Sequence, residues 1–241
     1  MHPQDWRDPE LAQRWSAAAG NNNPMRNQHL DLLLLLLEQV FEPGKTILDL
    51  GYGSGLVDEA IFQRIETAQI VGVDRSEAMM ALAAERLAAY PFKFISVTHD
   101  MTDLPALLGP DSPLPRQQYQ IAINVQALHH LPHESLRAGY HAVYEILEPG
   151  GYFFQAERIA VPSAAVFDLY HALWAHLDGQ YGTQVAASEQ SSYADHVAHL
   201  ARREDHPAAL QAHLAWLAEA GFDAACLDAY GNRALIAARK P

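Results

Sequence analysis

A cluster of glycines follows a short apolar stretch, in the run Ile47-Leu48-Asp49-Leu50-Gly51-Tyr52-Gly53-Ser54-Gly55. Glycine has no Cβ, so a turn built from Gly51, Gly53 and Gly55 can pass close to a bound ligand. Asp74 ends the next apolar stretch, where a carboxylate can accept hydrogen bonds from both hydroxyls of a ribose. The spacing predicts a nucleoside site; the alternative is a plain strand-to-helix turn with a helix-capping Asp74.

The residues around these glycines indicate which nucleoside would bind. A dinucleotide site usually carries a further glycine one position after Gly55, beside a pyrophosphate, and this chain has Leu56 there. Asp49 would repel a pyrophosphate, whereas it would attract an ammonium group. We therefore expect a ligand with an amine near the turn, and S-adenosylmethionine is such a nucleoside.

Short apolar stretches alternate with helical patterns from Thr46 onward, which is typical of a parallel sheet covered by helices. Strands are expected at residues 46–50, 70–74, 92–97, 120–125, 152–156, 224–228 and 234–238, and helices at residues 56–65, 76–89 and 133–147. Ser76 suits the N-cap of the second of these helices. The alternation predicts an α/β fold.

Two segments interrupt this alternation. Residues 1–40 read as two helices separated by a polar break at residues 20–24, and the second carries a leucine run that we expect to be buried. Residues 162–206 are rich in aromatic residues and histidine and are expected to form helices and loops. Pro207 suits the first turn of a following helix, which Gly221 would end.

Both segments could cover a bound ligand. We expect a single domain over residues 1–241, with an N-terminal helical lid at 1–40 and a cap insertion at 162–206. Aromatic side chains of these segments would either face the substrate or pack in the core, and they include Trp6, Trp15, Tyr170 and Trp174.

Acidic residues outnumber basic ones by 29 to 16, for a formal net charge of -13. Proteins that bind nucleic acids neutralise phosphates with lysine and arginine, so this balance argues against DNA, RNA and anionic membranes as partners. The longest apolar run is too short for a membrane span. Cys226 is the single cysteine, so it cannot form an intramolecular disulfide, and a cytoplasmic location is expected.

Five segments, in order, resemble the motifs of the class I S-adenosylmethionine-dependent methyltransferases that act on small molecules. They are residues 49–55, 71–76, 98–101, 124–131 and 147–151. The resemblance implies a Rossmann-like, doubly wound, mostly parallel seven-stranded sheet with helices on both faces. It also implies the cofactor S-adenosyl-L-methionine, the product S-adenosyl-L-homocysteine, and transfer to an O, N or C atom of a small molecule.

The cofactor-binding residues that the resemblance implies are Asp49, Gly51, Gly53, Gly55, Asp74, Arg75, Asp100, Met101 and Asn124. Two of them have simpler interpretations. Asp100 could cap the turn that follows it, and Asn124 could satisfy backbone groups at the end of the sheet. Tyr52 departs from the family, which commonly has a small residue there.

The sulfonium is already electrophilic, so the protein must mainly orient the acceptor, and a base is needed only where the acceptor loses a proton early. His129 and His130 are the candidate catalytic residues because histidine titrates near neutral pH. With His133 they also invite a metal site, but adjacent residues point apart in a helix or strand, and no metal is expected. Glu157 is either a general base or, as we favour, a surface partner of an arginine such as Arg158.

Three other functions stay open. The C-terminal pattern also resembles carboxy-S-adenosylmethionine synthases, which alter the cofactor and bind an additional carboxylate with an arginine that the sequence does not place. A non-catalytic S-adenosylmethionine-binding protein would carry the same site. A nicotinamide-dependent oxidoreductase is disfavoured by the glycine spacing and by Asp49. Oligomeric state is not readable from the sequence.

Overall fold

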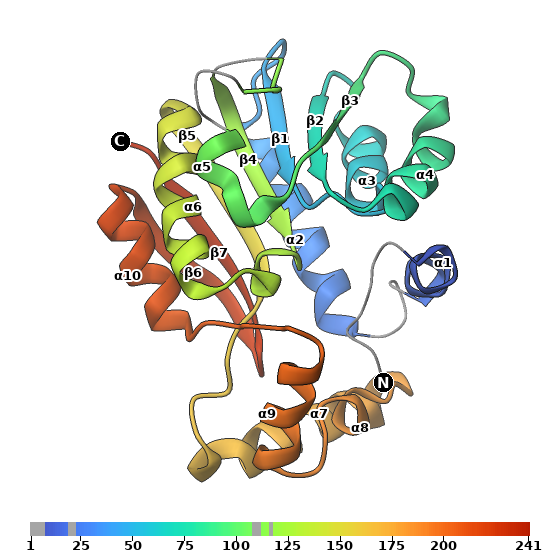
Figure 1. Ribbon diagram of the computed structural model, residues 1–241, viewed down its shortest axis with the longest axis vertical. Helices are drawn as coiled ribbons and strands as arrows, with labels where there is room; N and C mark the ends of the chain where they lie inside the picture. Colours follow the sequence, from blue (N-terminus) through green and yellow to red (C-terminus); the bar gives the residue numbers. More distant parts are fainter. Residues whose placement is uncertain (1–7, 19–22, 108–111, 116–117) are drawn as a thin grey trace.

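The protein is built around one seven-stranded sheet with the strand order β3-β2-β1-β4-β5-β7-β6 (Figure 1). The computed structural model describes residues 8–18, 23–107, 112–115 and 118–241. Strands β1 to β5 are parallel, whereas β7 is antiparallel to both β5 and β6. The strands are β1 Thr46–Leu50, β2 Gln69–Asp74, β3 Phe94–Thr98, β4 Tyr119–Val125, β5 Leu147–Arg158, β6 Asp223–Tyr230 and β7 Arg233–Arg239. This confirms the predicted mostly parallel α/β fold.

Helices cover both faces of the sheet (Figure 1). Helices α2 (Pro24–Val40) and α3 (Leu56–Arg64) bury apolar residues against one face. Helices α6 (His133–Ile146) and α10 (Leu210–Ala220) pack on the other face, with the short α5 (Leu104–Leu107) beside α6. Strand β1 is buried along its whole length, which explains its apolar sequence. The leucine run of α2 is only partly buried, because Leu35 is 47% exposed.

The N-terminal helix and the insertion lie outside these layers. Helix α1 (Pro9–Ala18) packs against α4 (Glu77–Arg86). The insertion forms α7 (Phe167–Tyr181), α8 (Val185–Ser188) and α9 (Tyr193–Arg202), grouped beyond one end of the sheet (Figure 1). Trp6 and most of the polar break at residues 20–24 lie outside the described residues. Within the described part, no helix is both long and apolar enough to cross a membrane.

Buried ion pairs attach the insertion to the sheet. Glu189, which follows α8, contacts Arg158 at the end of β5, and its other oxygen lies 3.4 Å from Nη2 of Arg233 in β7. Buried charges of this kind are tolerated only when they are paired. The insertion is therefore held in place by electrostatics as well as by its own apolar cluster.

Two of the three helix ends expected from capping residues are confirmed, and the third is wrong. Ser76 caps α4 by accepting a hydrogen bond from the backbone N–H of Met79 at 3.2 Å, and Gly221 ends α10 with φ = 107°. The expected helix start at Pro207 is wrong, because α10 begins at Leu210. The preceding segment instead lies along the end of β5, where the N–H of Ala160 donates to the carbonyl of Ala208 at 2.9 Å.

Candidate active site

A cleft opens at the carboxyl ends of β1, β2 and β4. The strand order reverses between β1 and β4, and open α/β sheets bind ligands at such a switch point. The cleft and its open mouth together contain about 1090 Å³ of empty space. Its lining includes Trp15, Arg26, Asp49, Gly51, Gly53, Asp74, Arg75, Asp100, Met101, Gln126, His130, Arg203 and Glu204.

The glycine turn after β1 forms the floor of this cleft. Gly51 and Gly53 have φ = 81° and 57°, a left-handed conformation that side chains rarely adopt. A Cβ on Gly51 would also lie 2.3 Å from the Cβ of Ala127. Gly55 does not line the cleft: it precedes α3, and a Cβ there would press on Leu87 at 3.1 Å. Gly55 thus has a packing role in the structure, and the cofactor contact expected of it stays a prediction.

Asp74 connects this turn to the end of β2. Its Oδ2 accepts a hydrogen bond from the N–H of Gly53 at 2.9 Å, and its Oδ1 accepts one from the N–H of Ser76 at 2.8 Å. Burial raises the pKa of Asp74, and the backbone N–H groups oppose that shift. A carboxylate oxygen accepts more than one hydrogen bond, so Asp74 can hold the turn and still accept ribose hydroxyls.

Asp49 and Arg26 place opposite charges in the same cleft. Asp49 is 1% exposed, and apart from its contact with the carboxyl of Asp58, neither of its oxygens has a hydrogen-bond partner among the described residues. Burial raises its pKa, and the charges of Asp58 and Asp74 raise it further. Arg26 is 7% exposed and its Nε also lacks a partner within the described chain. Such groups are costly unless a ligand satisfies them, and an amino-acid zwitterion would satisfy both.

Arg26 is a cleft residue that was not expected from the sequence, although its position in α2 carries a signal. Arg26 shares the buried side of α2 with His29, Leu33 and Leu37, a spacing of one helical face. An arginine on a buried helical face implies a partner or a ligand. Its guanidinium lies 5.7 Å from the ring centroid of Trp15 in α1, so the N-terminal segment does contribute to the cleft.

Arg75 and Asp100 form the rim of the cleft. Nη1 of Arg75 lies 2.9 Å from Oδ2 of Asp100, and both side chains are half exposed. Oδ1 of Asp100 accepts a hydrogen bond from the N–H of Thr102 at 3.0 Å, so the turn-capping interpretation of Asp100 is correct while the residue also lines the cleft with Met101. The ring of Tyr52 packs against Phe94, and its hydroxyl lies 2.7 Å from that of Ser96.

Asn124 does not reach the cleft. It is fully buried in β4, and its Nδ2 donates to the carbonyl of Leu50 at 2.8 Å. This contact supports the alternative interpretation, a side chain that joins the ends of β4 and β1, and the cofactor contact stays a prediction.

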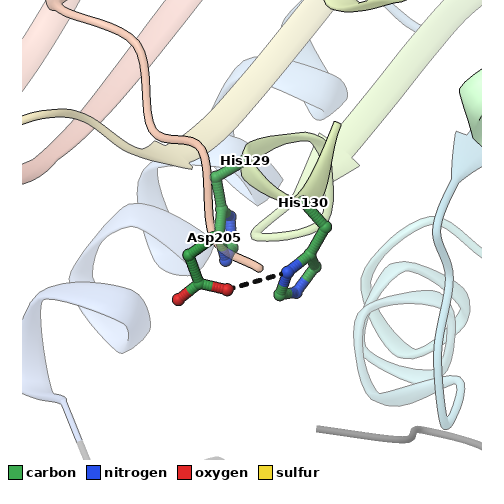
Figure 2. Close-up of side chains that lie close together, drawn as sticks. All are labelled: His129, His130 and Asp205. Atoms are coloured by element: carbon green, nitrogen blue, oxygen red, sulfur yellow. Dashed lines mark ion pairs between the residues drawn. The ribbon is translucent and has the colours of Figure 1, made fainter. Parts of the chain in front are cut away.

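The two candidate catalytic histidines lie in a 3-10 turn, η3 (Leu128–His130). Figure 2 shows their side chains converging with Asp205, which follows α9. Their ring centroids are 4.2 Å apart, so the expectation that adjacent histidines would point apart is wrong, because η3 is neither a strand nor an α-helix. Of the two, His130 lines the cleft, and its Nδ1 lies 2.9 Å from Oδ1 of Asp205.

His129 lies behind His130 and is paired with Glu157. Nδ1 of His129 lies 2.6 Å from Oε1 of Glu157, whose Oε2 accepts from the N–H of Leu128 at 2.9 Å. Burial would raise the pKa of Glu157, but the charge of His129 and its hydrogen bond lower the pKa below its ordinary value. Burial lowers the pKa of His129. Glu157 is 0% exposed, so the favoured surface ion pair is wrong; strand β5 extends past the expected end and carries it inward.

The same cluster has the spacing of a metal site, since atoms of His129, His130 and Asp205 lie within 4.8 Å of one another. However, the other oxygen of Asp205 lies 3.5 Å from Nη1 of Arg158 and 3.3 Å from Nε of Arg203. These guanidiniums already balance the carboxylate, and a divalent ion would add uncompensated charge to a buried network. The arrangement favours a His130–Asp205 ion pair over a metal site.

The insertion contributes to the cleft differently from expectation. Tyr170 and Trp174 pack in its own apolar cluster with Phe167 and are not among the residues that line the cleft. Arg203 and Glu204, at the end of α9, do line it.

Comparisons with known proteins agree with this geometry. The family model described as a methyltransferase domain matches residues 47–151. The trans-aconitate 2-methyltransferase of Acidovorax sp. (strain JS42) is 35% identical over 112 residues, covering 46% of this chain and 37% of that protein. The ubiquinone biosynthesis O-methyltransferase of Pseudomonas fluorescens (strain SBW25) is 27% identical over 166 residues, covering 67% of this chain and 65% of that protein. The matches thus span less than two thirds of the relatives' own length.

Solved structures share the fold. An O-methyltransferase family 2 protein from Planctomyces limnophilus DSM 3776, solved in complex with apigenin, has a TM-score of 0.64 at 18% identity and covers 98% of this chain and 62% of its own. A structure described as PigF with SAH has a TM-score of 0.60 at 16% identity, with 98% and 60% covered.

Proposed function

We propose that the chain is a class I S-adenosylmethionine-dependent methyltransferase that transfers the methyl group of S-adenosyl-L-methionine to an O, N or C atom of a small molecule. One observation carries the proposal: the glycine turn, Asp49 and Asp74 surround one cleft at the switch point of the sheet. The matched methyltransferase domain covers this whole arrangement. S-adenosyl-L-homocysteine is then the second product.

The cofactor would lie across the carboxyl ends of β1, β2 and β3. Asp74 would accept the ribose hydroxyls, and Gly51 and Gly53 would let the backbone approach the cofactor. Asp100 and Met101, with Arg75 at the rim, would border the adenine. Asp49 would bind the ammonium group and Arg26 the carboxylate of the methionine moiety, because both side chains are buried and, within the described chain, the oxygens of Asp49 and the Nε of Arg26 have no hydrogen-bond partner of opposite charge.

His130 is the residue we assign to the acceptor. The cofactor supplies an electrophilic methyl group, so the protein has to hold the acceptor in line with it and remove a proton where the acceptor carries one. His130 lines the cleft, and Asp205 at 2.9 Å orients its ring through Nδ1. Nε2 would then take the acceptor's proton. His129, held by buried Glu157, is a positioning residue behind it.

The N-terminal segment (1–40) and the insertion (162–206) are proposed as the lid and the cap that exclude water from the cleft. Trp15 and Arg26 of the N-terminal segment line the cleft, and so do Arg203 and Glu204 at the end of the insertion. Given the net charge of -13 and the single cysteine, we propose a small-molecule acceptor without nucleic-acid or membrane partners, and a cytoplasmic location.

Titration calorimetry with S-adenosylhomocysteine and, in parallel, NAD tests the cofactor assignment. S-adenosylhomocysteine is expected to bind and NAD is not; the reverse would restore the oxidoreductase alternative. An acceptor panel should follow, scored by S-adenosylhomocysteine release, and should contain trans-aconitate and apigenin because these names occur among the relatives. Cofactor binding without turnover across a broad panel would favour a non-catalytic binding protein.

A further inference from the structure

Asp58, in the first turn of α3, is a buried acid for which the proposed function has no role. It is 0% exposed, and its carboxyl lies within hydrogen-bonding reach of the Asp49 carboxyl. Within the described residues, none of the four oxygens of this pair receives a hydrogen bond from a third residue. Two buried carboxyls that contact each other need a proton or a cation between them.

Among the described residues, no cationic side chain forms a hydrogen bond with either carboxyl of the pair. Asp74 at the end of β2 adds a further negative charge, and Tyr52 is a neutral phenol whose own pKa burial raises to about 12. Arg26 of α2 lines the same cleft, but within the described chain neither its Nε nor the oxygens of the two carboxyls have a hydrogen-bond partner that would join them. Burial raises the pKa of Asp58 to about 7 and that of Asp49 well above its ordinary value. A proton shared between the two carboxyls would relieve their repulsion in the empty site.

We propose that Asp49 and Asp58 form a two-carboxylate subsite for the ammonium group of the cofactor, and that the pair releases its shared proton to solvent when the ammonium group binds. The charge balances. The empty pair carries one negative charge, and two carboxylates with one ammonium also sum to one negative charge. Asp58 is thus a positioning residue that acts through Asp49, which alone of the two lines the cleft. The inference rests on the proposed function.

Calorimetric titration of the full chain with S-adenosylhomocysteine, at pH 7.5 in buffers of different ionisation enthalpy, counts the protons exchanged. We expect release of about one proton per ligand bound in the wild type, and release of close to none in Asp58→Asn, because Asp49 then keeps its charge in the empty site. Glu59→Gln is the matched control: Glu59 is the adjacent acid of α3 and pairs with Arg86, so this variant should still release the proton.

A second measurement needs no variant. In difference infrared spectra of the wild type, the C=O band of a protonated carboxyl should disappear when S-adenosylhomocysteine binds. Binding without proton release, or equal release by Asp58→Asn and the wild type, would overturn the ammonium subsite while leaving the proposed function intact. Failure of S-adenosylhomocysteine to bind the wild type would overturn the proposed function itself.

Discussion

The carboxylate of Asp74 accepts a hydrogen bond from the backbone N–H of Gly53, 21 positions earlier in the chain, at 2.9 Å. This contact fixes the glycine turn against the end of β2. One side chain thereby shapes the turn and presents its remaining acceptor sites to the cleft.

Asp74→Asn should weaken S-adenosylhomocysteine binding strongly. The amide keeps the shape but loses the charge and one acceptor, and a hydrogen bond to a charged group contributes about 1.5–3 kcal/mol, which corresponds to roughly a 10- to 150-fold rise in Kd. Titration calorimetry measures this. An unchanged Kd would contradict the ribose assignment.

Substitutions to alanine at Gly51 and at Gly53 should lower the free energy of unfolding by different amounts. Gly51→Ala combines a left-handed φ with a Cβ 2.3 Å from the Cβ of Ala127, and should lower the unfolding free energy by about 2–5 kcal/mol. Gly53→Ala meets no atom within 4 Å and should cost only about 1–2 kcal/mol, from the backbone conformation. Urea unfolding of both variants tests the difference, and equal losses would show that crowding at Gly51 is relieved.

Arg26→Gln should separate two nucleoside ligands. Arg26 is assigned to the carboxylate of the methionine moiety, so the variant should bind S-adenosylhomocysteine roughly tenfold or more weakly. It should bind 5′-methylthioadenosine, which lacks that carboxylate, as the wild type does. Parallel loss for both ligands would instead indicate that Arg26 supports the fold of the cleft.

His130→Gln should lower kcat by roughly 10²- to 10⁴-fold for an acceptor that must lose a proton. Its affinity for S-adenosylhomocysteine should stay at the wild-type value, since the residue is assigned to the acceptor. His133→Gln is the control, because His133 is exposed and does not line the cleft. A parallel loss in the two variants would argue against His130 as the base.

Asp205→Asn should destabilise the protein by about 3–5 kcal/mol at pH 7, because it leaves buried cationic partners uncompensated. Burial opposes ionisation of Asp205, but the hydrogen bond from His130 and nearby positive charges lower its pKa below the ordinary value. A depressed folded-state pKa stabilises the fold above the unfolded-state pKa of about 3.9, and this stability is lost as the pH falls further. The difference between variant and wild type should therefore be constant from pH 7 to about 5 and shrink below about pH 4. Urea unfolding over this pH range tests it, and a difference that persists at low pH would contradict the ionised Asp205.

The sequence by itself determined the features that residues close together in the chain form. The apolar run of β1, the turn at Gly51 and Gly53, and the acid at Asp74 follow one another along the chain, so their spacing alone predicted the fold and the position of the cleft. Alternation of strands and helices predicted the sheet for the same reason, since each element is defined by its own periodicity.

Only the tertiary structure decided which distant side chains meet. Asp205 reaches His130 because the chain returns along the end of β5 after the insertion, and Arg26 enters the cleft because α2 packs over the sheet. Glu157 and Asn124 turned inward for a related reason, as their positions depend on strand length and pairing rather than on residue type. Contacts between residues far apart in the chain depend on packing, which no local pattern encodes.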